Sequence, residues 1–206
     1  MKRAVVFGAT GLVGRNVVEQ LLSNDLISSV TIVARREVKI SHSKLKCLIL
    51  SDFSDLDNHA EFLCAEIYFV CTGTTIKKAG SKDNFFKTDH DIPLKIARLA
   101  ERLNVPVLSV ISSIGADSRS GNFYLKTKGI MENSLKEAYE GDLQIMRPSL
   151  LLGKREEFRP AEFAGVILFK ALGWLMVGPV RKYRGVEAGD VASLMIQGAL
   201  NSKSFQ

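Results

Sequence analysis

The chain has 206 residues, a formal net charge of +6 and a hydrophobic share of 46%. This length suits one domain with a well-buried core and is too short for two ordinary catalytic domains in series, and the composition excludes a disordered or fibrous protein. The basic residues are scattered in pairs and are not interleaved with aromatic residues, so we expect no nucleic acid among the partners.

The predicted elements begin with a short apolar run at residues 4–7, which ends on a glycine and is followed by helical periodicity over 12–22. A β-branched run at 30–33 completes a unit of strand, helix and strand. The same alternation continues with strands at 45–50, 67–71, 107–111 and 143–146 and helices at 93–103 and 124–138. Because strands that alternate with helices form parallel sheets covered on both faces, the sequence predicts an α/β protein with a doubly wound Rossmann fold.

The regular alternation loosens after Pro148. Helices are predicted at 161–172 and 188–200, with an irregular stretch between them. No linker separates this part from the rest. We therefore expect residues 149–206 to form a small cap on the substrate side of one domain that spans 1–206.

The apolar segment 161–178 raises the question of a membrane. Lys170 interrupts it before any uncharged run reaches the roughly 18 to 20 residues that a membrane span needs. A buried helix is therefore expected, and residues 158–184 are a candidate contact surface for a membrane or a protein partner. A monomer and a homodimer are both compatible with the sequence.

A glycine-rich turn joins the first predicted strand to the first predicted helix. In such turns one glycine lets the chain leave the strand, a second lets the backbone approach a phosphate and a third lets the helix pack on the sheet. Backbone N–H groups at a helix N-terminus bind anions. The sequence therefore predicts that a dinucleotide pyrophosphate is bound by the turn Gly8-Ala9-Thr10-Gly11-Leu12-Val13-Gly14.

The end of the second predicted strand distinguishes NADP from NAD. An acidic residue at this place bonds the ribose 2′-hydroxyl of NAD, whereas this chain has Arg35 and Arg36 after Ala34. A guanidinium matches the oxygens of a 2′-phosphate. We therefore predict NADP(H), with Arg35 as the first contact and Arg36 or Arg15 in support.

Two further strand ends are predicted to line the cofactor. Asp52 follows the third strand, and Thr72, Gly73 and Thr74 follow the fourth, where the adenine and its ribose pass in such a sheet. All four residues also suit ordinary turns at strand ends.

A second motif carries chemistry. Tyr124 and Lys128 are four residues apart, so they share one face of a helix. A lysine ammonium beside a tyrosine hydroxyl stabilises the phenolate, which lets the pair give a proton to a carbonyl or take one from an alcohol. Ser112 and Ser113 end the fifth predicted strand at the carboxyl edge of the sheet, where ligands bind in this architecture.

These motifs resemble those of the short-chain dehydrogenases/reductases, and in particular the atypical branch that includes the Tat-interacting-protein family. The resemblance implies that Tyr124 is the acid or base, that Lys128 also holds the nicotinamide ribose, and that Ser113 bonds the substrate oxygen, with Ser112 as the alternative. It covers nearly the whole chain and extends to the motifs Ile114-Gly115-Ala116-Asp117, Arg147-Pro148-Ser149 and Asp190-Val191-Ala192.

The chain departs from the family pattern in the helix after the fourth strand. Many relatives have an asparagine there that belongs to a proton relay, and this chain has Thr88-Asp89-His90. We expect Asp89 to cap the helix and His90 to lie at the surface. His42, His59 and His90 lack the spacing of metal ligands, so no metal site is predicted.

Together these features predict an NADP(H)-dependent oxidoreductase that acts on the carbonyl or alcohol group of a small molecule of unknown identity. The odd number of cysteines (Cys47, Cys64 and Cys71) and an N-terminus without a signal-peptide pattern predict a cytoplasmic location. Two alternatives stay open. A non-catalytic NADP-binding sensor or regulator needs only the glycine turn, and a nucleotide-sugar epimerase shares the Arg147-Pro148 motif.

Overall fold

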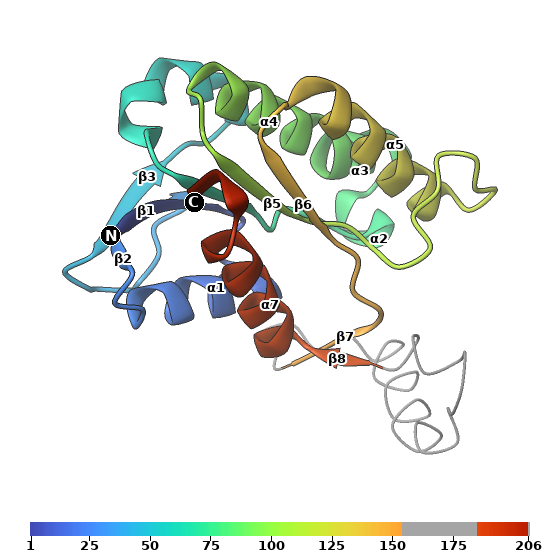
Figure 1. Cartoon of the computed structure of the whole chain (residues 1–206). Helices are drawn as coiled ribbons and strands as arrows, with labels where there is room; N and C mark the ends of the chain where they lie inside the picture. The colour runs from blue at the N-terminus through green and yellow to red at the C-terminus, as the bar shows by residue number, and fades with distance from the viewer. Residues whose placement is uncertain (154–184, 206) are drawn as a thin grey trace.

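A single parallel sheet of six strands forms the centre of the molecule, in the order β3-β2-β1-β4-β5-β6 (Figure 1). The computed structural model describes residues 1–153 and 185–205. The sheet confirms the predicted α/β Rossmann fold, because the order reverses between β1 and β4, where nucleotides bind in this architecture. The strands are β1 (Lys2–Phe7), β2 (Ile27–Ala34), β3 (Leu45–Ile49), β4 (Ile67–Val70), β5 (Val107–Ile111) and β6 (Asp142–Met146).

Helices cover both faces of the sheet. In Figure 1 two helices lie below the sheet, α1 (Leu12–Leu22) and α7 (Ala188–Leu200), and two lie above it, α4 (Ile92–Arg102) and α5 (Phe123–Ala138). The bounds of α7 match those of the helix predicted at 188–200. Shorter elements are α2 (Ile76–Ala79), α3 (Lys82–Phe86), and the segments η1 (Phe53–Leu63), η2 (Lys87–Asp91) and η4 (Lys203–Phe205).

The central strand β1 explains why the strands read as continuous apolar runs. Ala4 and Val6 pack with α1 and α7 on one face, and Val5 and Phe7 pack with α4 and α5 on the other. All four side chains are at most 1% exposed. A strand buried on both faces cannot alternate between apolar and polar residues.

The helix after β4 begins earlier than predicted. The sequence places its start at Pro93, because proline is favoured in the first turn of a helix. In the structure α3, the π-helical turn η2 and α4 follow one another directly from Lys82 to Arg102. A π turn just before Pro93 suits a residue that has no N–H to donate to the preceding turn.

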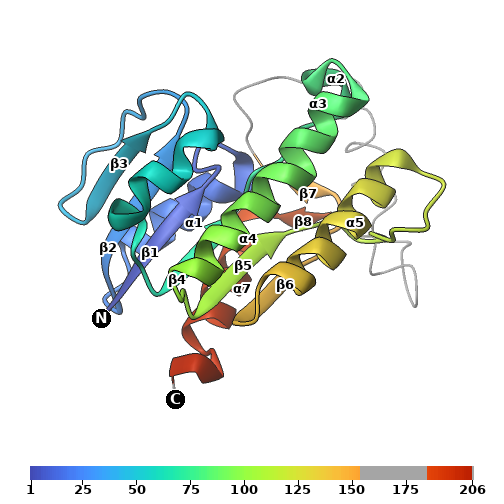
Figure 2. The same cartoon turned by 90° about the horizontal axis from the view of Figure 1, so that it is seen from above.

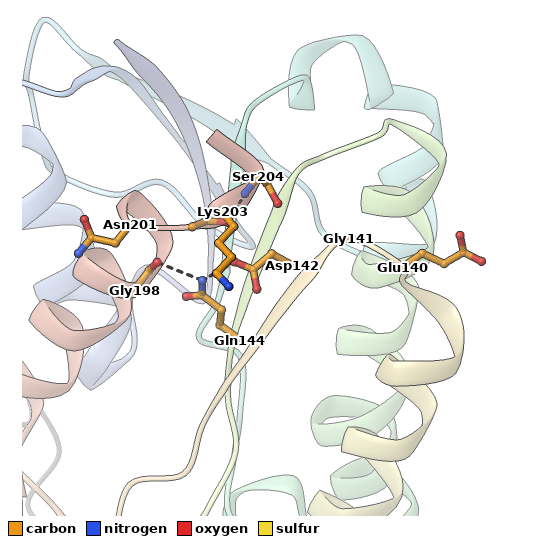
Figure 3. A pocket seen from close by; sticks show the side chains of 9 residues that line it. Glu140, Gly141, Asp142, Gln144, Gly198, Asn201, Lys203 and Ser204 are labelled. Carbon is orange, nitrogen blue, oxygen red and sulfur yellow. Dashed lines mark hydrogen bonds between the residues drawn. The ribbon is translucent and has the colours of Figure 1, made fainter. Parts of the chain in front are cut away.

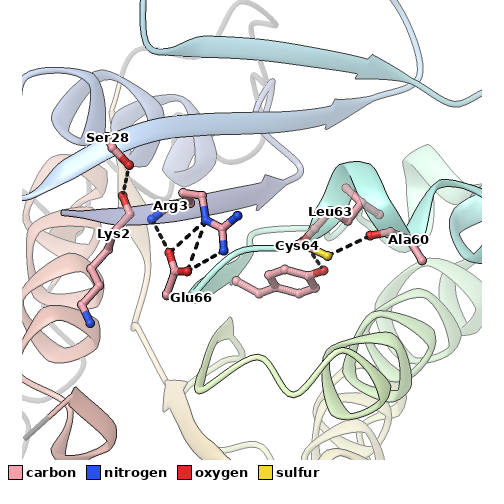
Figure 4. Close-up of polar contacts among 8 residues, drawn as sticks. Lys2, Arg3, Ser28, Ala60, Leu63, Cys64 and Glu66 are labelled. Carbon is pink, nitrogen blue, oxygen red and sulfur yellow. Dashed lines mark hydrogen bonds and ion pairs between the residues drawn. The ribbon is translucent and has the colours of Figure 1, made fainter.

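Polar contacts fix the amino edge of the sheet (Figure 4). Arg3 pairs with Glu66, with 2.7 Å between Nη2 and Oε1, and the backbone N–H of Arg3 donates to Glu66 Oε2 at 2.6 Å. Partial burial raises the pKa of Glu66, but the hydrogen bonds and charge of Arg3 outweigh it, so the pKa lies below its ordinary value. The buried hydroxyl of Tyr68 donates to the carbonyl of Leu63 at 2.7 Å. In Figure 2 both termini lie at this end, opposite α2.

The last part of the chain returns to the core. A two-stranded parallel ribbon joins β7 (Leu151–Leu152) to β8 (Val186–Glu187), and α7 then packs along α1. The predicted helix at 161–172 and the candidate contact surface at 158–184 lie outside the described residues. The cap over 149–206 therefore stays a prediction. Within the described residues, none of the helices has the length and apolar character needed to span a membrane.

Candidate functional site

The glycine turn between β1 and α1 is built from the backbone alone. Gly8 has a φ of +79°, and a Cβ atom on it would lie 2.6 Å from the carbonyl carbon of Cys71. A Cβ atom on Gly14 would lie 2.2 Å from the carbonyl oxygen of Gly8. The same oxygen accepts a hydrogen bond from the N–H of Gly11 at 2.9 Å. No side chain fits at the first or the third glycine.

The turn leaves the N-terminus of α1 open to an anion. Gly11 is the N-cap residue and provides no side-chain cap, and the first turn carries no acidic residue. The N–H groups of the first turn lack partners within the helix, and the helix dipole favours negative charge there. A pyrophosphate fits this arrangement.

A buried hydroxyl next to the turn also fits a ligand. Within residues 1–153 and 185–205, Oγ1 of Thr72 is the buried side-chain oxygen without a hydrogen-bond partner. A Cβ atom on Gly8 would lie 2.8 Å from the backbone nitrogen of Thr72, so the two residues are adjacent. An unpaired buried hydroxyl costs about 1–3 kcal/mol. A ligand bound across β1 and β4 can supply the missing partner.

A buried ion pair lies next to the loop that follows β4. Lys128 and Asp89 have side chains that are 4% and 1% exposed, with 2.8 Å between Nζ and Oδ1. The second oxygen of Asp89 accepts the backbone N–H of Thr74 at 2.8 Å. The expectation that Asp89 caps a helix is wrong, because it lies inside the π-helical turn η2 and its carboxylate is buried against α5 and the end of β4.

Gly73 borders this ion pair. It is exposed, and a Cβ atom on it would lie 3.4 Å from Oδ1 of Asp89 and 4.0 Å from Nζ of Lys128. The absence of a side chain at this position leaves the space next to the ammonium open on the exposed side.

The two candidate serines have different surroundings. The hydroxyl of Ser112 is buried and donates to Oε1 of Glu132 at 2.5 Å. Glu132 also accepts two hydrogen bonds from the guanidinium of Arg147, one of them from Nε at 2.9 Å. Ser113 is half-buried, and its hydroxyl makes a long contact of 3.3 Å with the carbonyl oxygen of Ile114. Ser113 is thus the serine whose hydroxyl can turn to a ligand.

Tyr124 begins α5. Asn122 caps this helix through its side chain, and the tyrosine ring lies against Phe85 of α3, with 5.7 Å between the ring centroids. Tyr124, Lys128 and Glu132 follow one another at four-residue spacing, so they share one face. Sequence reasoning missed Glu132, and this spacing is the signal that could have found it.

The loop that starts at Ser113 packs against the same helix. The N–H of Asp117 donates to the carbonyl of Leu125 at 3.2 Å. A Cβ atom on Gly129 would lie 2.2 Å from the carbonyl carbon of Asp117, so this contact requires a glycine. The fold thereby brings the loop that holds Ser113 onto the first turns of α5, where Tyr124 and Lys128 lie.

The remaining predicted cofactor residues lie at other strand ends. Arg35 and Arg36 are exposed directly after β2. Asp52 caps η1 by accepting the N–H of Ser54 at 2.9 Å, and this hydrogen bond lowers the pKa of its carboxyl group. The side chain of Asp52 thus has the turn role that the sequence left open beside the cofactor role.

His90 is buried, so the expectation of a surface residue is wrong. Its Nδ1 lies 2.7 Å from Oδ1 of Asp91, its Nε2 lies 3.0 Å from the hydroxyl of Ser134, and its ring stacks on Phe86 at 4.4 Å between centroids. The continuous helix places His90 against α5. His90 therefore forms a contact between two helices. A helix predicted to begin at Pro93 does not contain His90, so the sequence pattern did not indicate this contact.

A separate open hollow lies at the amino edge of the sheet, away from the glycine turn (Figure 3). It has a volume of about 530 Å³ and lies between the start of β6 and the end of α7, and its lining includes Asp142, Gln144, Gly198, Asn201 and Lys203. Gln144 donates to Asp142 and to the carbonyl of Gly198 at 2.8 and 3.1 Å. The hollow is at the edge opposite the glycine turn, and its polar groups already bond one another.

Residues 8–152 match the family described as NAD(P)H-binding. This range contains the glycine turn, Asp89, Ser113, Tyr124 and Lys128. The chain therefore belongs to the NAD(P)H-binding family, with the Rossmann fold and the oxidoreductase-like character predicted from its motifs. A nicotinamide dinucleotide is its cofactor class.

Individual relatives agree with this assignment. The chain is 33% identical over 179 residues to protein fmp52, mitochondrial, of Emericella nidulans, a match that covers 84% of this chain and 77% of that protein. It is 34% identical over 174 residues to protein HTATIP2 of Rattus norvegicus, with 83% and 72% covered. The Bordetella bronchiseptica enzyme WbmH in complex with NAD+ has a TM-score of 0.75 over 98% of this chain and 73% of that chain. At 14% identity that likeness shows the fold alone.

The relatives contradict the predicted cytoplasmic location. The fmp52 proteins of Emericella nidulans, Candida albicans and Aspergillus niger are all named mitochondrial. The prediction depended on the cysteines and on an N-terminus without a signal-peptide pattern, and all three cysteines are indeed free. Free thiols indicate a reducing compartment, and this property does not single out the cytoplasm.

Proposed function

We propose that the protein is an NADP(H)-dependent oxidoreductase that interconverts a carbonyl and an alcohol on a small-molecule substrate. The observation that carries the proposal is the buried ammonium of Lys128, which lies one helical turn from Tyr124 and is bordered by the open space at Gly73. A site that only binds a dinucleotide needs the glycine turn. It does not need a buried lysine on the same helical face as a tyrosine.

The side chains divide the work of the proposed reaction. A bound nicotinamide supplies the hydride that reduces a carbonyl carbon. Tyr124 gives a proton to the carbonyl oxygen, and its phenolate later takes a proton back from solvent. The ammonium of Lys128 stabilises the phenolate and has donors left for ribose hydroxyls. In the opposite direction the same groups accept the proton of an alcohol.

Ser113 is the proposed partner of the substrate oxygen. The hydroxyl of Ser112 is committed to Glu132, and removing it would leave a buried carboxylate with one hydrogen bond fewer. We propose that Ser112 supports the site through Glu132 and Arg147, while Ser113 contacts the substrate.

The preference for NADP(H) is proposed from Arg35 and Arg36. Both are exposed at the carboxyl end of β2, where a 2′-phosphate can reach them, and no acidic residue stands between them and the strand. Fluorescence titration tests this preference. NADPH is expected to bind more tightly than NADH, and Arg35→Ala should reduce that difference. Equal affinities in the wild type would overturn it.

Turnover of NADPH with a panel of aldehydes and ketones tests the catalytic role. Tyr124→Phe should lower kcat about 10²- to 10⁴-fold, the usual contribution of a general acid or base. Tyr139→Phe is the matched control, since the Tyr139 hydroxyl donates to Val105 away from the site. A wild-type protein that binds NADPH but turns over no substrate would favour the non-catalytic regulator, and conversion of a nucleotide sugar would favour the epimerase.

A further inference from the structure

We infer that Asp89 is a positioning residue that fixes Lys128 for the nicotinamide ribose and links it to the cofactor loop at Thr74. This inference rests on the proposed function and deepens it, because it assigns a role to a carboxylate that the family pattern does not supply. The evidence is the set of contacts around the two oxygens of Asp89.

Each oxygen of Asp89 has a different partner from a different element. Oδ1 accepts from Lys128 of α5, and Oδ2 accepts from the backbone N–H of Thr74 after β4, both at 2.8 Å. An asparagine in the same orientation would place its NH2 group, which can only donate, against one of these two donors. The position therefore requires a carboxylate and not the amide that many relatives have there.

The carboxylate of Asp89 accepts only one of the hydrogen bonds that the ammonium of Lys128 can donate. An ammonium has three N–H donors. One of them is used by Asp89, which leaves two for the pair of adjacent hydroxyls on a ribose. The Cβ position of Gly73 lies 4.0 Å from Nζ, so a ligand that passes over Gly73 can reach the ammonium. Asp89 thus orients the ammonium without occupying the ligand side.

The neighbouring elements hold Asp89 in place. It lies in the π-helical turn η2 between α3 and α4, and its side chain is 1% exposed. The next carboxylate, Asp91, is half exposed and bonds His90 instead. Two carboxylates of one turn therefore have separate functions, and only Asp89 faces the site.

Binding of two nucleotides tests the inference. NADPH carries the nicotinamide ribose, whereas adenosine 2′,5′-bisphosphate carries only the adenine half. In Asp89→Asn the affinity for NADPH should fall about ten- to a hundredfold, the range for a charged hydrogen bond. The affinity for the bisphosphate should fall less, because this ligand lacks the ribose assigned to Lys128 and can be affected only through the Thr74 loop, and Asp91→Asn should leave both affinities unchanged.

A double variant tests whether Asp89 acts through Lys128. If it does, Asp89→Asn combined with Lys128→Met should bind NADPH no more weakly than Lys128→Met alone. Where Lys128→Met alone fails to fold, the double variant, which replaces both charges, should still fold, and it should bind NADPH more weakly than the wild type with a smaller loss for the bisphosphate.

Three results would overturn the inference. They are an equal loss of affinity for both nucleotides, which is the mark of a purely structural role, unchanged binding of NADPH by Asp89→Asn, and additive losses in the double variant. A wild-type protein that binds the bisphosphate but neither NADPH nor NADH would instead overturn the proposed function itself.

Discussion

Two regions at the carboxyl edge of the sheet obtain their electrostatic properties from different groups, one from the backbone and one from side chains. The glycine turn offers backbone N–H groups at the start of α1, and the first turn of this helix carries no acidic residue. The face of α5 that carries Tyr124 instead depends on side-chain charges, which are the buried Lys128–Asp89 pair and the buried Glu132 with the half-exposed Arg147. A helix dipole is available without an opposite charge, but a buried charge needs its partner. Substitutions in the glycine turn should therefore destabilise the protein through steric clash. Substitutions on α5 should destabilise it because a buried charge loses its partner.

The largest expected effect is on the buried pair. Lys128→Met leaves the carboxylate of Asp89 buried without its counter-ion, which should lower the free energy of unfolding by about 3–5 kcal/mol. Adding Asp89→Asn should restore most of this loss. Urea denaturation measures both, and Lys126→Met, an exposed position on the same helix, should change stability by less than about 0.5 kcal/mol. A Lys128→Met protein as stable as the wild type would show that this region does not depend on the buried ion pair.

The second effect is steric and belongs to the glycine turn. In Gly14→Ala the new Cβ atom would lie 2.2 Å from the carbonyl oxygen of Gly8, so the helix must shift, at a cost of about 1–3 kcal/mol. NADPH binding should be lost as well, because α1 moves away from the phosphates. Gly121→Ala is the control, since a Cβ atom there meets nothing within 4 Å. Unchanged stability and binding in Gly14→Ala would mean that the turn is looser than its geometry indicates.

The third effect separates binding from stability. A Cβ atom on Gly73 makes only ordinary contacts of 3.4 and 4.0 Å with the ion pair. Gly73→Ala should therefore change the free energy of unfolding by less than about 0.5 kcal/mol. The methyl group would occupy the space next to Lys128, so we expect NADPH to bind about tenfold more weakly, or roughly 1.4 kcal/mol. Fluorescence titration measures this loss, and full affinity would show that the ribose does not pass over Gly73.

The smallest effect lies far from both regions. Because Arg3 holds the pKa of Glu66 below its ordinary value of 4.5, the pair stabilises the protein at neutral pH. This contribution is lost as the pH falls below about 4.5 and through the lower pKa of the folded state. The pair is partly exposed, so it should contribute less than about 1 kcal/mol. Urea midpoints between pH 3 and 6 should fall less steeply for Glu66→Gln, and NADPH affinity at neutral pH should be the same in both proteins.

The two regions also differ in how far the sequence could predict them. The glycine turn is local, so the consecutive residues 4–22 were enough to predict a strand, a turn and a helix in the right places. The helical spacing of Tyr124 and Lys128 was equally readable. Asp89, by contrast, lies 39 positions before Lys128, and the sequence assigned it to a helix cap.

The errors have one physical cause in the helix before β5. Proline is a reliable marker of a first helical turn, and it led to a predicted start at Pro93. The tertiary structure extends the helix back to Lys82 through a π turn. This extension is what buries Asp89 and His90, and no local pattern in the sequence indicates it.

The π turn at Lys87–Asp91 sets the rotational phase of the helix on either side of it. Each residue of an α-helix turns the chain by about 100°, and a π turn contains one residue more than an α-helical turn. Deletion of one residue within this turn would therefore rotate everything before it by about a quarter of a revolution relative to α4, and Asp89 would no longer face Lys128. The charge balance of the site thus depends on the length of one helical turn.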